Sequence, residues 1–268
     1  MTSFDRFITV DWSGGNDTGP RPRCDAIWIG EAGCVPLYMR NRGLAEGWLV
    51  ARVEQALTQG DRLCIGFDFP FGYPLGFARA LTGRADPLAV WDWLAARIGD
   101  GPKANNRFDV AGSINLALGA GRGPFWANAL KRDIVGLGRT KAGYENPFPD
   151  KRACERQAKG AFSCWQLAGA GSVGSQVLMG LPVLQRLRGL FAGRIAVWPF
   201  EPLTAPVAFV EVWPSLRPDA VRLAEQMGEI RDAAQVRLTS EWLAGLAPAA
   251  LAAMLQVDQP EEGWILGL

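Results

Sequence analysis

The sequence predicts an α/β protein built on a mixed β-sheet flanked by helices. Two apolar strands, at residues 7–12 and 62–68, each carry an aspartate close to the point where turn residues begin. Between them, residues 48–57 repeat leucine and valine every four positions, which is the apolar stripe of an amphipathic helix. Strands that alternate with such helices are typical of a sheet with parallel neighbours.

The first 75 residues are predicted to form three strands, a helix and a fourth strand. Residues 7–12 are β-branched and aromatic and stop at a Ser-Gly-Gly turn. Two further strands are expected at residues 24–29 and 34–39. The segment 62–68 is apolar on both faces, which is typical of a central parallel strand.

Helices and glycine-rich loops are expected to dominate residues 76–193. We predict that these residues form a helical, loop-rich insertion between the fourth and fifth core strands of a single domain, residues 1–268. Within the insertion we predict a helix at 87–98, long loops at 101–123 and 140–149, and a helix at 173–191 that Pro182 kinks or divides. After it we predict strands at 194–198 and 208–213, followed by helices at 218–226 and 229–246.

The composition restricts the chemistry that this chain can perform. It has 268 residues and no histidine, which removes the usual general base and the commonest transition-metal ligand. Its 5 cysteines include no CxxC pair, which argues against a disulfide framework and against a zinc site. Catalysis must therefore use carboxylates, Lys, Tyr, Ser, Cys or a hard metal ion.

The chain has no apolar run of about 18 residues, and its first residues lack the pattern of a signal peptide. We therefore expect a cytoplasmic protein with no membrane partner.

Charge is distributed unevenly along the chain. Residues 97–159 hold 12 Lys+Arg against 6 Asp+Glu, and aromatic residues such as Trp126 and Tyr144 lie among them. Positive charge with stacking rings is typical of proteins that bind single-stranded nucleic acid. The alternative is that the rings pack in a core while the charges pair with one another or face solvent.

Asp11 and Asp68 are the strongest candidates for a functional site. Each stands at the carboxyl end of an apolar strand, and open α/β sheets bind ligands outside those strand ends. Parallel neighbours lie about 4.8 Å apart, so the two carboxylates would be close enough to share Mg²⁺ or Mn²⁺. The alternative is structural, because aspartate also orders turns.

Two later acids are weaker candidates. Glu211 interrupts an otherwise apolar strand, so it needs a partner if it is buried and otherwise faces outward from an edge strand. Asp232 is followed by small alanines that would let a helix approach the sheet, although an acid in a first helical turn is also stabilised by the helix dipole.

These acids, in this order, resemble a family of predicted nucleases of unknown function with a ribonuclease H-like fold. The matching segments are Val10-Asp11-Trp12-Ser13-Gly14, the run from Gly66 to Pro74, Val210-Glu211-Val212-Trp213-Pro214 and Asp232-Ala233-Ala234. The resemblance implies that the first and fourth strands are adjacent. It also implies a carboxylate cluster that in nuclease relatives binds two divalent ions. An acid on the first helix has no clear counterpart here, and Glu54 is the nearest candidate.

A second motif, Gly169 to Gly174, matches the dinucleotide-binding pattern GxGxxG. The segment before it is a poor buried strand, and no acid follows about 20 residues on to bind a ribose. These features favour a turn that starts a helix, although its amides remain able to hold an anion.

Together these features predict a metal-dependent phosphodiesterase or nuclease. Asp11 and Asp68 would hold Mg²⁺ or Mn²⁺, and Asp232 and Glu211 would complete the cluster. One alternative is a protein of the same fold that binds a nucleotide or phosphometabolite without hydrolysing it. The other is a structural protein with a vestigial site.

Overall fold

The computed structural model describes residues 3–259 and 261–268. The chain divides into two compact units. Unit 1 comprises Met1–Phe69, Leu187–Asp258 and Ile265–Gly267, and unit 2 comprises Pro70–Arg186, Gln259–Trp264 and Leu268.

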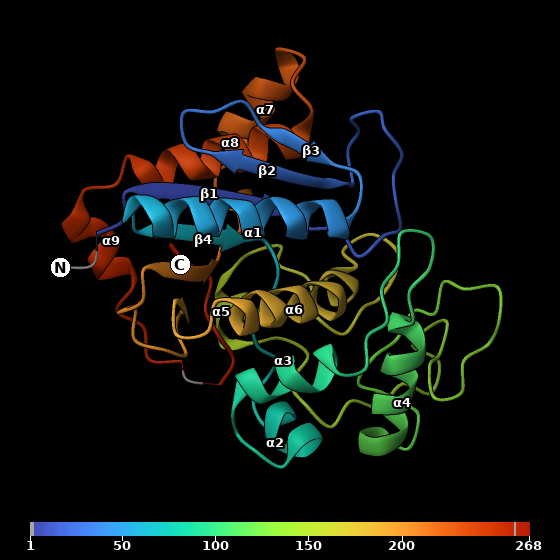
Figure 1. The fold of residues 1–268 in the computed structure, drawn as a ribbon. Helices are drawn as coiled ribbons and strands as arrows, with labels where there is room; N and C mark the ends of the chain where they lie inside the picture. Colours follow the sequence, from blue (N-terminus) through green and yellow to red (C-terminus); the bar gives the residue numbers. More distant parts are fainter. Residues whose placement is uncertain (1–2, 260) are drawn as a thin grey trace. The chain divides into compact units, whose positions relative to one another are not determined.

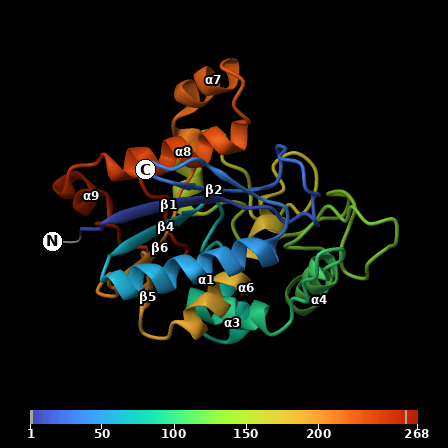
Figure 2. The same ribbon diagram turned by 45° about the horizontal axis from the view of Figure 1, so that its top comes forward.

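Unit 1 is built on a six-stranded mixed sheet in the order β3-β2-β1-β4-β6-β5; Figure 1 labels β1 to β4, and Figure 2 labels β5 and β6. The strands are β1 (Arg6–Asp11), β2 (Ile27–Glu31), β3 (Leu37–Met39), β4 (Leu63–Phe67), β5 (Ile195–Val197) and β6 (Val207–Glu211). The β1-β2-β3 part is antiparallel, whereas β1, β4, β6 and β5 run parallel. The predicted mixed sheet is confirmed, and so is the adjacency of the first and fourth strands.

Helices cover both faces of this sheet. They are α1 (Arg42–Gln59), α7 (Pro218–Gln226), α8 (Arg231–Ala244) and α9 (Pro248–Met254), with a short 3₁₀ helix at Pro214–Leu216. Helix α1 lies on one face and α8 on the other (Figure 2). The Asn41 side chain accepts a hydrogen bond from the Leu44 amide at the start of α1, and Gly60, with φ 77°, ends the helix in the left-handed conformation.

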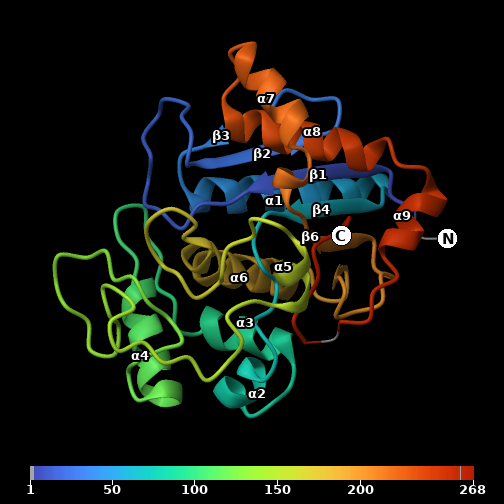
Figure 3. The ribbon, with the colours of Figure 1, turned by 180° about the vertical axis from the view of Figure 1, so that it is seen from behind.

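Helix α8 packs closely on β1 and β2. A Cβ atom on Gly30 of β2 would lie 2.6 Å from the backbone of Val236 in α8, so only glycine fits at this crossing. Trp28 of β2 packs on the same helix beside Ala233 and Val236. Helix α7 packs in turn on α8 (Figure 3).

Unit 2 is made of helices and long connections. Its helices are α2 (Phe77–Thr82), α3 (Pro87–Ala95), α4 (Arg107–Gly119), α5 (Ala153–Gln157) and most of α6 (Val173–Leu190). Helix α6 is one helix with Pro182 inside it, rather than two. Rings of Tyr73, Phe77, Phe125 and Trp165 pack together in the core of this unit.

The predicted loop at 101–123 is wrong, because α4 occupies most of it. Its glycines suggested a loop, but Gly112 has a packing role. A Cβ there would lie 2.7 Å from the carbonyl oxygen of Val135, so the glycine lets α4 approach the following chain. None of the helices in the described residues is long and apolar enough to cross a membrane.

Candidate functional site

Asp11 and Asp68 meet at the edge of the sheet where β1 and β4 end. The parallel register pairs Val10 with Phe67, which places the next residues, the two aspartates, side by side. The side-chain hydrogen bond between the two carboxyl groups raises the pKa of Asp11 and lowers that of Asp68. The Trp12 amide donates to Oδ1 of Asp68 at 2.7 Å and fixes the orientation of that carboxylate. The predicted juxtaposition is therefore present in the structure.

The surroundings of this pair disfavour negative charge. Burial raises the pKa of Asp68 to about 7, against the lowering effect of the Trp12 amide. The pKa of Asp11 lies well above its usual value because of burial, and then because of the charges of Asp68 and Asp232. Both side chains are nevertheless partly exposed, so solvent and small ligands reach them.

Asp232 joins the pair from the first turn of α8. Strand alternation puts Asp11 on the same face of β1 as Thr9, which pairs with Gly30 beneath α8, so the aspartate and the helix share one face. Asp232 is buried, and burial raises its pKa. Its negative charge acts on both Asp11 and Asp68. Three of the predicted site residues thus form one group, which we call the carboxylate site.

Asp25 is a fourth acid at this site, and the sequence reasoning missed it. It precedes β2, whose antiparallel course starts at the edge where β1 ends. Its amide donates to Oδ2 of Asp232 at 2.7 Å, and its charge raises the pKa of Asp11 and of Asp232. Its φ of 56° is rare for a residue other than glycine, although aspartate is among those that tolerate it.

Glu211 lies on the other side of the sheet from the carboxylate site. It pairs with Phe67, one residue before Asp68, and successive side chains of a strand point to opposite faces. The side chain is buried. The expectation that Glu211 completes the cluster is therefore corrected, since its position in the register directs it away. Glu54 is exposed on α1 and is likewise not part of the site.

The described residues contain no group of three or more acids or cysteines already arranged to hold a metal ion. The Asp11 and Asp68 pair nevertheless has the chemistry that a hard cation requires. The two carboxyl groups lie side by side, and their surroundings raise the pKa of each. A divalent cation could compensate the negative charge of the ionised pair and bind both groups through oxygen.

The glycine motif in unit 2 is explained by packing. A Cβ on Gly174 would lie 2.4 Å from the carbonyl oxygen of Cys164, and one on Gly171 would meet the ring of Phe162. The glycines therefore let the start of α6 lie against the preceding chain. This arrangement favours the helix-starting turn over a dinucleotide site.

Five of the 12 Lys and Arg side chains in the basic segment of unit 2, residues 97–159, form ion pairs with acids of the same segment. Its ion pairs are Arg122 with Glu145, Arg132 with Asp109, Arg139 with Asp133, Lys141 with Asp150 and the buried pair Arg152 with Glu155. The Phe108 and Phe125 rings are buried. These contacts favour charge pairing for those five cations and core packing for the two rings.

Comparisons of the chain with protein-family models, with curated proteins and with solved structures found no match.

Proposed function

We propose that unit 1 is a divalent-cation-dependent phosphodiester hydrolase, a nuclease of ribonuclease H-like arrangement. The observation that carries this proposal is the pair of Asp11 and Asp68 carboxyl groups, hydrogen-bonded to each other at the carboxyl ends of adjacent parallel strands. Ligands of open α/β sheets bind outside such strand ends. A chain without histidine can perform this chemistry, because it requires only carboxylates and a hard metal ion.

Each acid has a separate role in the proposal. Asp11 and Asp68 hold Mg²⁺ or Mn²⁺, and the Trp12 amide keeps Asp68 in position. Asp232 adds negative charge from the start of α8 and is itself held by the Asp25 amide. The bound cation would supply an activated water molecule and neutralise charge on the phosphate oxygens.

The test is a calorimetric titration of Mn²⁺ into the protein and into an Asp11→Asn/Asp68→Asn double variant. Asp219→Asn is the matched control, because this exposed aspartate of α7 lies outside the carboxylate site. We expect the double variant to lose Mn²⁺ binding and the control to keep it. Equal binding by all three proteins would exclude the proposed metal site.

A further inference from the structure

Two arginines next to the carboxylate site have side chains without a partner among the described residues. Arg21 and Arg23 are exposed in the segment that leads to Asp25. Within the described residues, neither guanidinium group forms a hydrogen bond or an ion pair. Most other arginines of unit 1 are engaged: Arg6, Arg40, Arg52, Arg188, Arg222 and Arg237 bind carboxylates, and Arg42 and Arg62 donate to backbone carbonyls.

A third arginine, Arg231, is exposed at the first residue of α8. Positive charge is disfavoured at this end of a helix, because the backbone N–H groups already make it positive. Arg231 forms no ion pair among the described residues, and its charge acts on the neighbouring Asp232. A cation in this position opposes the local stability of the helix, which is typical of residues kept for function.

The three arginines belong to two segments that meet at the carboxylate site. Consecutive Cα atoms are 3.8 Å apart, so the Cα atoms of Arg23 and Arg21 lie within about 8 Å and about 15 Å of the Asp25 Cα. Arg231 directly precedes Asp232, and the 2.7 Å hydrogen bond from the Asp25 amide to Asp232 joins the two segments. Exposed cations from two separate segments are therefore close in the chain to two acids of the carboxylate site.

We propose that Arg21, Arg23 and Arg231 form an arginine rim that binds the phosphates of a nucleic-acid strand beside the carboxylate site. This inference rests on the proposed function and names its substrate class. Phosphodiesters are repelled by a cluster of acids, so the substrate needs cations outside the cluster to hold it. Guanidinium groups bind phosphate oxygens with two parallel hydrogen bonds.

The number and placement of the arginines favour a polymer. A guanidinium group binds one phosphate through two hydrogen bonds, so three of them on two segments can bind more than one phosphate. Contacts of this kind position a strand without reading its bases, so we expect binding with little sequence preference.

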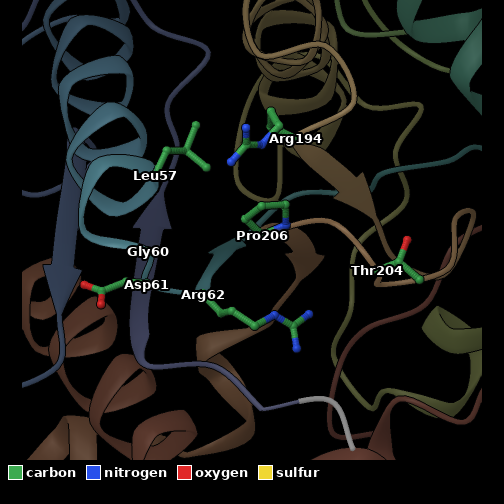
Figure 4. A pocket seen from close by; sticks show the side chains of 7 residues that line it. All are labelled: Leu57, Gly60, Asp61, Arg62, Arg194, Thr204 and Pro206. Atoms are coloured by element: carbon green, nitrogen blue, oxygen red, sulfur yellow. The ribbon is translucent and has the colours of Figure 1, made fainter.

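The experiment measures fluorescence anisotropy of a labelled single-stranded oligonucleotide, about 20 nucleotides long, in EDTA and over a series of salt concentrations. The test variant is Arg21→Gln/Arg23→Gln/Arg231→Gln. The matched control is Arg194→Gln, which removes an exposed arginine just before β5, at the opposite edge of the sheet, where it lines an open pocket of about 280 Å³ (Figure 4). Circular dichroism confirms that each variant is folded.

We expect the triple variant to bind roughly 10- to 100-fold more weakly, with a salt dependence shallower by about two in slope, and Arg194→Gln to bind as the wild type does. The inference is overturned if the wild type does not bind the strand, or if the triple variant and the control behave alike. Because EDTA removes the metal, the result is independent of Mn²⁺ binding. Loss of Mn²⁺ binding only in Asp11→Asn/Asp68→Asn tests the proposed function separately.

Discussion

The two edges of the sheet in unit 1 differ in how their charged residues are paired. At the edge where β1 and β4 begin, Arg62 donates to the carbonyl oxygens of Ser3 and Leu203, and its amide donates to Asp5. Glu31, at the same edge, binds both Arg6 and Arg52. Nearly every charge there has a partner within the protein, so this edge is stabilised by its charges.

The edge where β1 and β4 end places like charges close together. Asp11, Asp68 and Asp232 repel one another and their pKa values are raised, while the nearby Arg21 and Arg23 stay unpaired in the described chain. Among the described residues, the acids of the carboxylate site form no ion pair with these two arginines. Both sets of charges are therefore available to bind ligands. Unfavourable electrostatics maintained at one edge only is typical of a functional site.

The largest expected effect is on activity. Asp11→Asn should lower the rate of Mn²⁺-dependent cleavage of a single-stranded oligonucleotide by at least about 1,000-fold, because it removes a metal ligand. Unfolding in urea at pH 8 with EDTA should show no loss of stability, since a neutral amide replaces a carboxyl group whose ionisation the site disfavours. Full activity of this variant would contradict the view that the edge where β1 and β4 end is the functional one.

The second prediction concerns the opposite edge. Glu31→Gln should lower the free energy of unfolding by about 2–4 kcal/mol, because it leaves Arg6 and Arg52 without their shared carboxylate. The measurement is urea unfolding at pH 7. Cleavage by the folded variant should match that of the wild type. A variant that is stable but inactive would contradict the view that Glu31 contributes to stability and not to activity.

The third prediction is a dependence of stability on pH. The native pKa of Asp68 is raised to about 7, so the folded protein holds a proton that the unfolded chain releases near pH 4. Stability in EDTA should therefore fall as the pH rises from about 4 to about 7, with a contribution of at most about 1.4 kcal/mol per pH unit from each such group. Thermal unfolding at several pH values measures this slope.

Asp68→Asn should flatten the slope, and Asp219→Asn should leave it unchanged. Saturating Mn²⁺ should also reduce the slope, because it binds the ionised pair. A wild-type slope that persists in Asp68→Asn would assign the effect to other groups.

The smallest effect concerns the backbone at Asp25. Asn tolerates its left-handed conformation and Ala does not, so Asp25→Ala should cost about 1 kcal/mol of stability more than Asp25→Asn. Both variants lose the carboxylate. A difference between their Mn²⁺ affinities therefore measures how much the hydrogen bond from the residue 25 amide to Asp232 contributes to orienting that acid.

The ends of the strands were predictable from the sequence because apolar runs and turn residues are local signals. They placed Asp11 and Asp68 correctly, and strand adjacency brought the two together. The role of Asp25 was not predictable, because its contact with Asp232 spans 207 residues of sequence. Glu211 was misplaced for a related reason. Its side of the sheet depends on the register with β4, which no local pattern reveals.

Gly30 determines how near α8 can come to the sheet, and through it the spacing of the acids. Val236, whose backbone rests on Gly30, lies four residues and about 6 Å along α8 from Asp232. A side chain at residue 30 would lift the helix and carry Asp232 away from Asp11. The absence of a side chain at residue 30 therefore helps to set the distance between Asp232 on α8 and Asp11 on β1.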